Sequence, residues 1–165
     1  MRGARIITSF IVAWAFLCGW AIHAESTSTS HSPTGKIAKV LTLLMDTNGL
    51  VATSPSLYDR DAYQAFLNQH TNLVSGVRVD ICWSVRHGRG QSLNLRVELL
   101  GIGNRGFPTE VVLNHTVRQK LFSHWISLTL AGAEYKKLGT LSAWRATLWN
   151  GNQKLAEQKS FLWSL

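Results

Sequence analysis

Residues 77–86 alternate strictly between apolar and polar side chains, and this pattern constrains the fold more than any other feature of the sequence. The apolar positions are Val77, Val79, Ile81, Trp83 and Val85, and the positions between them are Arg78, Asp80, Cys82, Ser84 and Arg86. Because successive side chains of a strand point to opposite faces, the alternation predicts a half-buried β-strand. Residues 93–99 repeat it after the turn sequence HGRGQ, so we expect the two segments to form an antiparallel hairpin.

Other short apolar segments, separated by turn residues, predict more strands. They occupy residues 36–46, 110–115, 120–130, 142–149 and 153–161, and a further short extended piece is expected at 50–54. Residues 131–139, AGAEYKKLG, are expected only to connect two strands. About seven strands with closely spaced turns predict a mainly β protein, an antiparallel sandwich.

One segment, residues 56–70, has the spacing of a helix instead. Ser56 can cap its first turn, and the early residues Asp59 and Asp61 suit the positive end of the helix dipole. Apolar residues recur at intervals of three and four, namely Tyr58, Ala62 and Phe66 together with Tyr63 and Leu67. The sequence therefore predicts one helix, inserted in the sandwich and packed along one face.

The closing segment carries a resemblance to a known class of domain. The strand WRATLW, the turn NGN and the returning strand QKLAEQKSF are similar to the last two strands of immunoglobulin-like or fibronectin-type-III-like domains in exported bacterial proteins. The resemblance lies mainly in residues 143–163, and the chain lacks the paired cysteines of true immunoglobulin domains. It implies a sandwich but no functional residues, because such domains share an architecture and not a site.

The side-chain parity of this hairpin predicts its loop. Leu155 shares a sheet face with Leu148 and Trp144 only if the loop has an even number of residues, either 150–151 or 150–153. An even loop leaves two charged residues on the inward parity, Glu157 and Lys159, which requires an open edge or a β-bulge. The expected core positions of the segment are Trp144, Leu148, Phe161 and Trp163.

Residues 1–24 differ in kind from the rest of the chain. Two arginines precede the apolar run IITSFIVAWAFLCGWAI and a polar spacer follows it, which is typical of a secretory signal peptide, cleaved here after Ala24. Retention as an uncleaved anchor and lipid attachment at Cys18 are the alternatives. Residues 25–35 are then a flexible leader and residues 36–165 a single domain. We expect an exported protein, periplasmic or extracellular, with no transmembrane segment after cleavage.

Charge and cysteine content narrow the class of protein further. The chain has 17 basic and 9 acidic residues, and losing the two arginines of the signal peptide leaves 15 basic residues and a net charge of about +6. The basic residues are scattered, with only Lys136 and Lys137 adjacent, which argues against a nucleic-acid partner. Cys82 is the only cysteine after cleavage, so we expect a free thiol and no intramolecular disulfide.

No catalytic, metal-binding or cofactor-binding signature is evident in the sequence. A G-x-S-x-G elbow is absent, the histidines lack the spacing of metal ligands, and GIGNRG at 101–106 opens no helix that could hold a phosphate. Cys82, Asp80 and one of the histidines at 87, 115 or 124 could be drawn as a triad, but any chain of this size offers such a combination. We therefore expect a protein that is not an enzyme and that uses no cofactor.

Tryptophan is the remaining anomaly, because five of the 7 tryptophans lie in the predicted sandwich. Parity puts Trp83 and Trp144 in the core, and puts Trp125 and Trp149 on polar faces, where they either contact a ligand or cover an edge. The leading hypothesis is a non-enzymatic binding or structural module for a protein or a cell-envelope component. The alternatives are a carbohydrate-binding module that uses Trp125 and Trp149, or a small hydrolase or protease inhibitor, the inhibitor presenting the loop GIGNRGFPTE.

Overall fold

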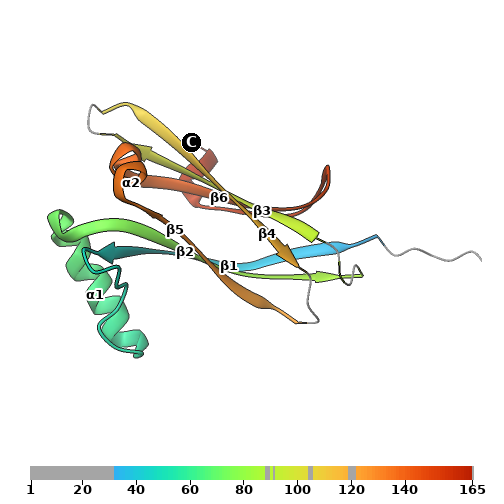
Figure 1. The fold of residues 1–165 in the computed structure, drawn as a ribbon, viewed down its shortest axis with the longest axis horizontal. Helices are drawn as coiled ribbons and strands as arrows, with labels where there is room; N and C mark the ends of the chain where they lie inside the picture. Colours follow the sequence, from blue (N-terminus) through green and yellow to red (C-terminus); the bar gives the residue numbers. More distant parts are fainter. Residues whose placement is uncertain (1–31, 88–89, 91, 104–105, 119–121, 165) are drawn as a thin grey trace, which may run out of the picture. The chain divides into compact units, whose positions relative to one another are not determined.

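Seven antiparallel strands form two sheets in the computed structural model, which describes residues 32–164 apart from 88–89, 91, 104–105 and 119–121. The first sheet has the order β1-β2-β5, with β1 at Thr34–Asp46, β2 at Val74–Arg86 and β5 at His124–Ala131. The second sheet has the order β4-β3-β6-β7, with β3 at Ser92–Ile102, β4 at Pro108–Arg118, β6 at Thr140–Asn150 and β7 at Gln153–Lys159. Figure 1 shows the two layers, and the predicted mainly β sandwich is confirmed. The predicted signal peptide lies outside the described residues.

The inner faces of the two sheets make one hydrophobic core. Strand β2 contributes the predicted alternating set, of which Val77, Val79 and Ile81 are fully buried and Trp83 nearly so. Strand β3 contributes its own alternate residues from the second sheet, including Leu95 and Val97. The predicted strands at 77–86 and 93–99 are therefore confirmed, although they pair with different neighbours and lie in different sheets. The prediction that they form a hairpin was wrong, because β2 pairs with β1 and β5 while β3 pairs with β4 and β6.

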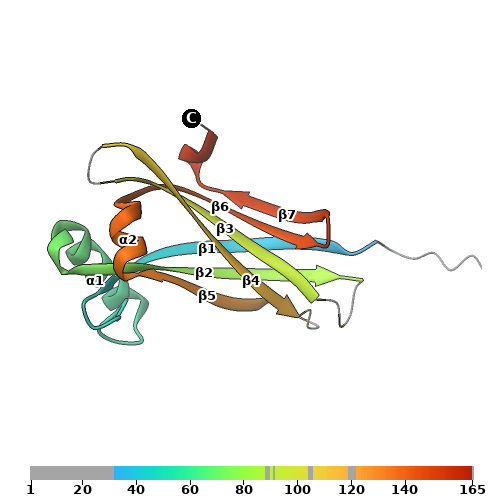
Figure 2. The same cartoon turned by 45° about the horizontal axis from the view of Figure 1, so that its top comes forward.

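A second helix, α2 at Gly132–Leu138, joins β5 to β6 where the sequence pattern indicated only a connection. Its single buried residue, Leu138, lies at one end of the core, and the helix contacts strands of both sheets. Figure 2 shows α2 between the two layers at that end. Gly139 ends the helix at a φ of +72°, with its N–H donating to the carbonyl of Tyr135. The helix has only seven residues, which is too short for a helical period to stand out from the sequence.

Helix α1, at Leu57–Gln69, confirms the predicted helix, but the face that it buries differs from the expected one. Ser56 caps it by accepting from the N–H of Asp59, as predicted. Leu67 is its only buried residue, whereas 82% of Tyr58 and 42% of Phe66 are exposed. The apolar residues at intervals of four therefore lie largely on the solvent side. The expected short strand at 50–54 is also wrong, since these residues form bends in the connection from β1 to α1.

The closing hairpin has an even loop, as predicted, but its two residues match neither of the predicted ranges, 150–151 or 150–153. Asn150 pairs with Gln153, so the loop is the residue pair 151–152, and a bulge follows at Leu155 because Leu148 pairs with Ala156. The bulge moves Glu157 off the inward parity and exposes it. The strand ends at Lys159, and a 3₁₀ turn at Phe161–Ser164 follows.

Two expected core residues of the last segment are not in the core. Phe161 is 86% exposed, and Trp163 is a half-buried residue whose ring lies over the guanidinium of Arg145. Arg145 is on the outer face of the second sheet, because its neighbours Trp144 and Ala146 point toward the core. The 3₁₀ turn breaks the strand parity after Ser160, which is why the alternation does not extend to these residues. Trp144 and Leu148 do pack in or against the core, as predicted.

Candidate functional site

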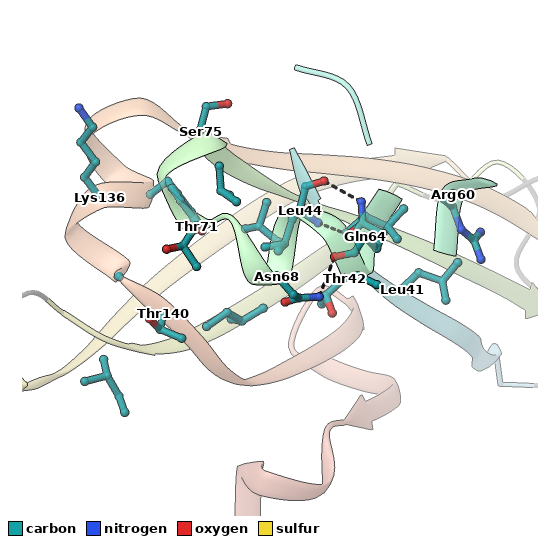
Figure 3. A pocket seen from close by; sticks show the side chains of 18 of the residues that line it. Leu41, Thr42, Leu44, Arg60, Gln64, Asn68, Thr71, Ser75, Lys136 and Thr140 are labelled. Carbon is teal, nitrogen blue, oxygen red and sulfur yellow. Dashed lines mark hydrogen bonds between the residues drawn. The ribbon is translucent and has the colours of Figure 1, made fainter. Parts of the chain in front are cut away.

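A cleft of about 1040 Å³ lies between α1 and α2 and is the candidate binding site. Its walls are the α1 face from Arg60 to Asn68, the edge of β1 at residues 41–44, the start of β2, and the segment from Tyr135 through Leu141. Figure 3 shows these side chains around the opening. Ligand pockets in proteins typically have about 300–1,000 Å³ and combine apolar walls with a few polar groups. The cleft has that size and that mixture of side chains.

A glutamine side chain of α1 forms hydrogen bonds with the backbone of one residue on the edge of β1 in this cleft. The side chain of Gln64 accepts from the N–H of Leu44 at 2.7 Å and donates to the carbonyl of Leu44 at 2.9 Å. Its amide nitrogen also donates to the carbonyl of Val51 at 2.8 Å. Within the described residues β1 is an edge strand that pairs only with β2, so Gln64 supplies the two hydrogen bonds that a neighbouring strand would make.

The charged residues of the cleft come from both helices. Arg60 of α1 forms an ion pair with Asp61 at 2.7 Å. Lys136 of α2 lines the cleft and has no ion-pair partner among the residues that the structure describes. Asp61 is the only carboxylate among the described residues that line the cleft, so these residues carry one more positive than negative charge.

A buried carboxylate fixes α1 beside β1. Asp46, at the end of β1, accepts from the N–H groups of Asn48 and Leu50 at 2.8 Å and from the hydroxyl of Tyr63 at 2.7 Å. The Tyr63 hydroxyl bond, with help from the backbone N–H groups, lowers the pKa of Asp46 below its ordinary value, and the same bond raises the pKa of Tyr63. Asp46 is therefore an ionised anchor for the turn and the helix, and every one of its oxygen atoms is engaged structurally.

The outer face of the second sheet holds a second charged cluster. Glu98 is only 3% exposed and lies between Arg145, which donates two hydrogen bonds to it, and Arg96 at 2.9 Å. The bonds from Arg145 hold the pKa of Glu98 below its usual value. Trp149, the candidate contact on this face, is half-buried and donates from its indole N–H to the hydroxyl of Thr147 at 2.9 Å.

Trp125 and Cys82 lie on the outer face of the first sheet, opposite each other on neighbouring strands. Trp125 is 56% exposed, and Cys82 is a half-buried free cysteine. Trp149 lies on the outer face of the other sheet, so the structure does not bring the two candidate tryptophans together. They cannot form one continuous stacking platform.

The structure also separates two of the three candidate histidines, His115 and His124, from Cys82 and Asp80. Cys82 and Asp80 point to the outer face of the first sheet, whereas His124 pairs with Trp83 on the inner face, with the ring centroids 6.3 Å apart. His115 is on β4 of the second sheet.

No group of three metal-ligating side chains occurs among the described residues. Likewise, none of the helices in the described residues has the length and apolarity to cross a membrane. The loop GIGNRGFPTE, expected to be the contact loop of a protease inhibitor, is described only in part, because residues 104–105 lie outside the described residues. Phe107 in this loop is exposed.

Sequence reasoning missed the cleft because its walls come from segments that are far apart along the chain. The one local signal was a glutamine, Gln64, on the same side of the helix as the buried Leu67, where an apolar residue would be expected. Its partner in β1 could not be found from the pattern, because backbone groups have no sequence signature. Comparisons with known protein families, with characterised proteins and with solved structures find no match for this chain.

Proposed function

We propose that this chain is an exported, non-enzymatic binding domain and that the cleft between α1 and α2 holds a segment of a protein of the cell envelope. The observation that carries the proposal is the cleft itself, with its volume of about 1040 Å³ and its mixed apolar and polar lining. Both helices are additions to the sandwich, and the cleft lies between them. Each helix buries only one residue, Leu67 in α1 and Leu138 in α2, so most of its surface is left for recognition.

The solvent side of α1 supports the same proposal. Tyr58 and Leu57 are largely exposed, and Phe66 is partly exposed on the same helix whose inner side lines the cleft. Exposed apolar side chains that gather on one element are typical of interaction surfaces. A partner seated in the cleft could extend onto this side of α1 and bury these rings, and aromatic residues of this kind often dominate binding energies.

The test is selection from a random library of ten-residue peptides displayed on phage, with the chain purified after export as the target. Enriched peptides are synthesised, and their dissociation constants are measured by fluorescence anisotropy. Ala65→Arg places a long side chain in the cleft from an exposed helical position, and Thr129→Arg adds the same side chain on the exposed outer face of β5. We expect the first variant to lose binding and the second to keep it. Failure to enrich any peptide, or equal binding by Ala65→Arg, would refute the proposal.

A second candidate function is carbohydrate binding, and the exposure of Trp125 is the specific observation in its favour. Its ring projects from a sheet face that also carries Ser127 and Thr129, groups that can bond sugar hydroxyls. Retention on insoluble cellulose, chitin or peptidoglycan would be measured for the wild type and for Trp125→Ala. Retention that depends on Trp125 would support this second function, and no retention on any of the three would exclude it for these polymers.

A further inference from the structure

We propose that the partner segment is extended and acidic and that it adds to the first sheet as a fourth strand, pairing with the free edge of β1 at Thr42. This inference rests on the proposed function and specifies how the cleft would bind. It follows from three features of the described residues: the direction of the backbone groups of β1, the space beside them, and the charge of the cleft walls.

The direction of the backbone groups follows from the hydrogen bonds of Leu44. Both its N–H and its carbonyl bond to Gln64, so they point away from β2. In an antiparallel ladder this direction repeats at every second residue, and the register of β1 against β2 is regular from Lys39 to Met45. The N–H and carbonyl of Thr42 therefore also point outward, along the wall of the cleft. In the described part of the chain, no side chain bonds to them as Gln64 bonds to Leu44.

The space beside this edge suits a short strand. The cleft is lined by four consecutive residues of β1, 41–44, which span about 13 Å at the rise of an extended chain. Toward its start, β1 lies against β7 so closely that a Cβ placed on Gly35 would be 2.8 Å from the Cβ of Leu155. An added strand thus has room at Thr42, is bounded by β7 on one side, and meets the Gln64 side chain on the other.

The unpaired edge is the type of surface that proteins use to recognise extended peptides. Main-chain hydrogen bonds then supply much of the affinity, while side chains of alternate residues enter pockets on either side. Here the side chains of α1 would lie on one side of the added strand and those of α2 and the start of β6 on the other. Figure 3 shows Gln64 and Thr42 with Arg60 on the α1 side, and Lys136 and Thr140 on the other.

The charge of the cleft selects among extended segments. Arg60 is already balanced by Asp61, which leaves Lys136 as an available cation at the α2 wall. The chain is also basic, with a formal net charge of +8 in full and of about +6 without the two arginines of the expected signal peptide. An acidic side chain in the partner segment would complement both the local and the overall charge, and it would also speed association.

The test uses the synthetic peptides obtained from the library selection described above. Thr42→Pro removes the N–H that the partner would bond, and proline is tolerated in an edge strand where the N–H faces outward. Thr42→Val is the matched control, because it keeps the backbone and the shape of the side chain. In parallel, each peptide amide is N-methylated in turn, which needs no change in the protein and so remains informative if Thr42→Pro does not fold.

We expect Thr42→Pro and N-methylation at one or two alternate peptide positions each to weaken binding about tenfold or more, and Thr42→Val to bind as the wild type does. Lys136→Glu is expected to weaken binding of the enriched peptides, which should contain aspartate or glutamate. Full binding by Thr42→Pro and by every N-methylated peptide, with binding still lost in Ala65→Arg, would overturn strand addition and leave the proposed function intact. If the chain instead forms a dimer that Thr42→Pro dissociates, the occupant is a second copy and the partner proposed here is wrong.

Discussion

Gln64 makes three hydrogen bonds from one side chain, and its replacement by leucine is the sharpest test of how α1 is held. Two of the bonds close the edge of β1 at Leu44, and the third ties the helix to the carbonyl of the buried Val51. Leucine has nearly the same size, so Gln64→Leu removes the bonds without leaving a large hole. The backbone groups of Leu44 and Val51 lose their partners in a part-buried site.

The expected cost follows from the number of bonds. A hydrogen bond in a folded protein contributes about 0.5–1.5 kcal/mol net, so three bonds amount to about 1.5–4.5 kcal/mol of the free energy of unfolding. Part of this loss is recovered if water reaches Leu44 through the cleft, which places the expected value near the lower end. The control is Asn68→Leu on the same helix. Asn68 makes one exposed bond to the carbonyl of Gln64, and its loss should cost about 0.5 kcal/mol or less.

The assay is equilibrium unfolding in urea, followed by tryptophan fluorescence and by circular dichroism. Coincidence of the two signals establishes a two-state transition, which allows free energies to be compared. A cost for Gln64→Leu no larger than that of Asn68→Leu would show that the strand-like pairing at Leu44 contributes nothing to stability. The same result would weaken the reasoning that assigns an outward direction to the groups of Thr42.

Three further predictions concern the sheet faces and the core. The pKa of Glu98 is lowered by Arg145, so ionised Glu98 stabilises the fold above its unfolded-state pKa of about 4.3. This stabilisation is lost as the pH falls through the lower pKa of the folded state. When urea unfolding is measured at a series of acidic pH values, Glu98→Gln should therefore lose less stability than the wild type below about pH 4.3. Gly139→Ala places a Cβ at a positive φ and 2.1 Å from a backbone oxygen. The free energy of unfolding should therefore fall by at least about 2 kcal/mol in the same assay. A near-neutral effect would contradict the close approach of α2 to β3. Trp83→Ala should lower the free energy of unfolding by about 3–5 kcal/mol, whereas Trp125→Ala should change it by no more than about 0.5 kcal/mol. Similar effects of the two substitutions would contradict the assignment of these tryptophans to opposite faces of the sheet.

The strands could be predicted where burial on one face produces a period of two. Val77, Val79 and Ile81 alternate with polar residues because β2 is the central strand of its sheet and only one face meets the core. The even loop of the last hairpin was predictable for the same reason, since Leu148 and Leu155 had to reach the same side. The bulge was one of the two alternatives, an open edge or a bulge, that the inward parity of Glu157 and Lys159 required. The short turn predicted the pairing of β6 with β7, but the neighbours of β2 and β3 were not predictable, because a period of two does not say which neighbour a strand pairs with.

Tertiary contacts decided the features that the pattern misjudged. The helix spacing of Tyr58 and Phe66 suggested a buried face, but α1 packs instead through Leu67 and through polar bonds from Tyr63 and Gln64. Helix α2 is held by the single buried Leu138, so its sequence contains almost no periodic signal. The cleft could not be foreseen at all, because it depends on where these two helices sit.

The bulge at Leu155 has a consequence for how β7 tolerates changes in length. Leu148 already pairs with Ala156 and Trp149 with Lys154, so Leu155 is one residue more than the ladder requires. Its side chain packs against the core close to Gly35, at the seam between the sheets. Deletion of Leu155 would leave the pairing of every later residue unchanged and would remove only its contact between the two sheets. Deletion of Glu157 would instead turn the following side chains to the opposite face of the sheet. Within one strand, a position that can be lost without disturbing the register therefore lies two residues from one that cannot.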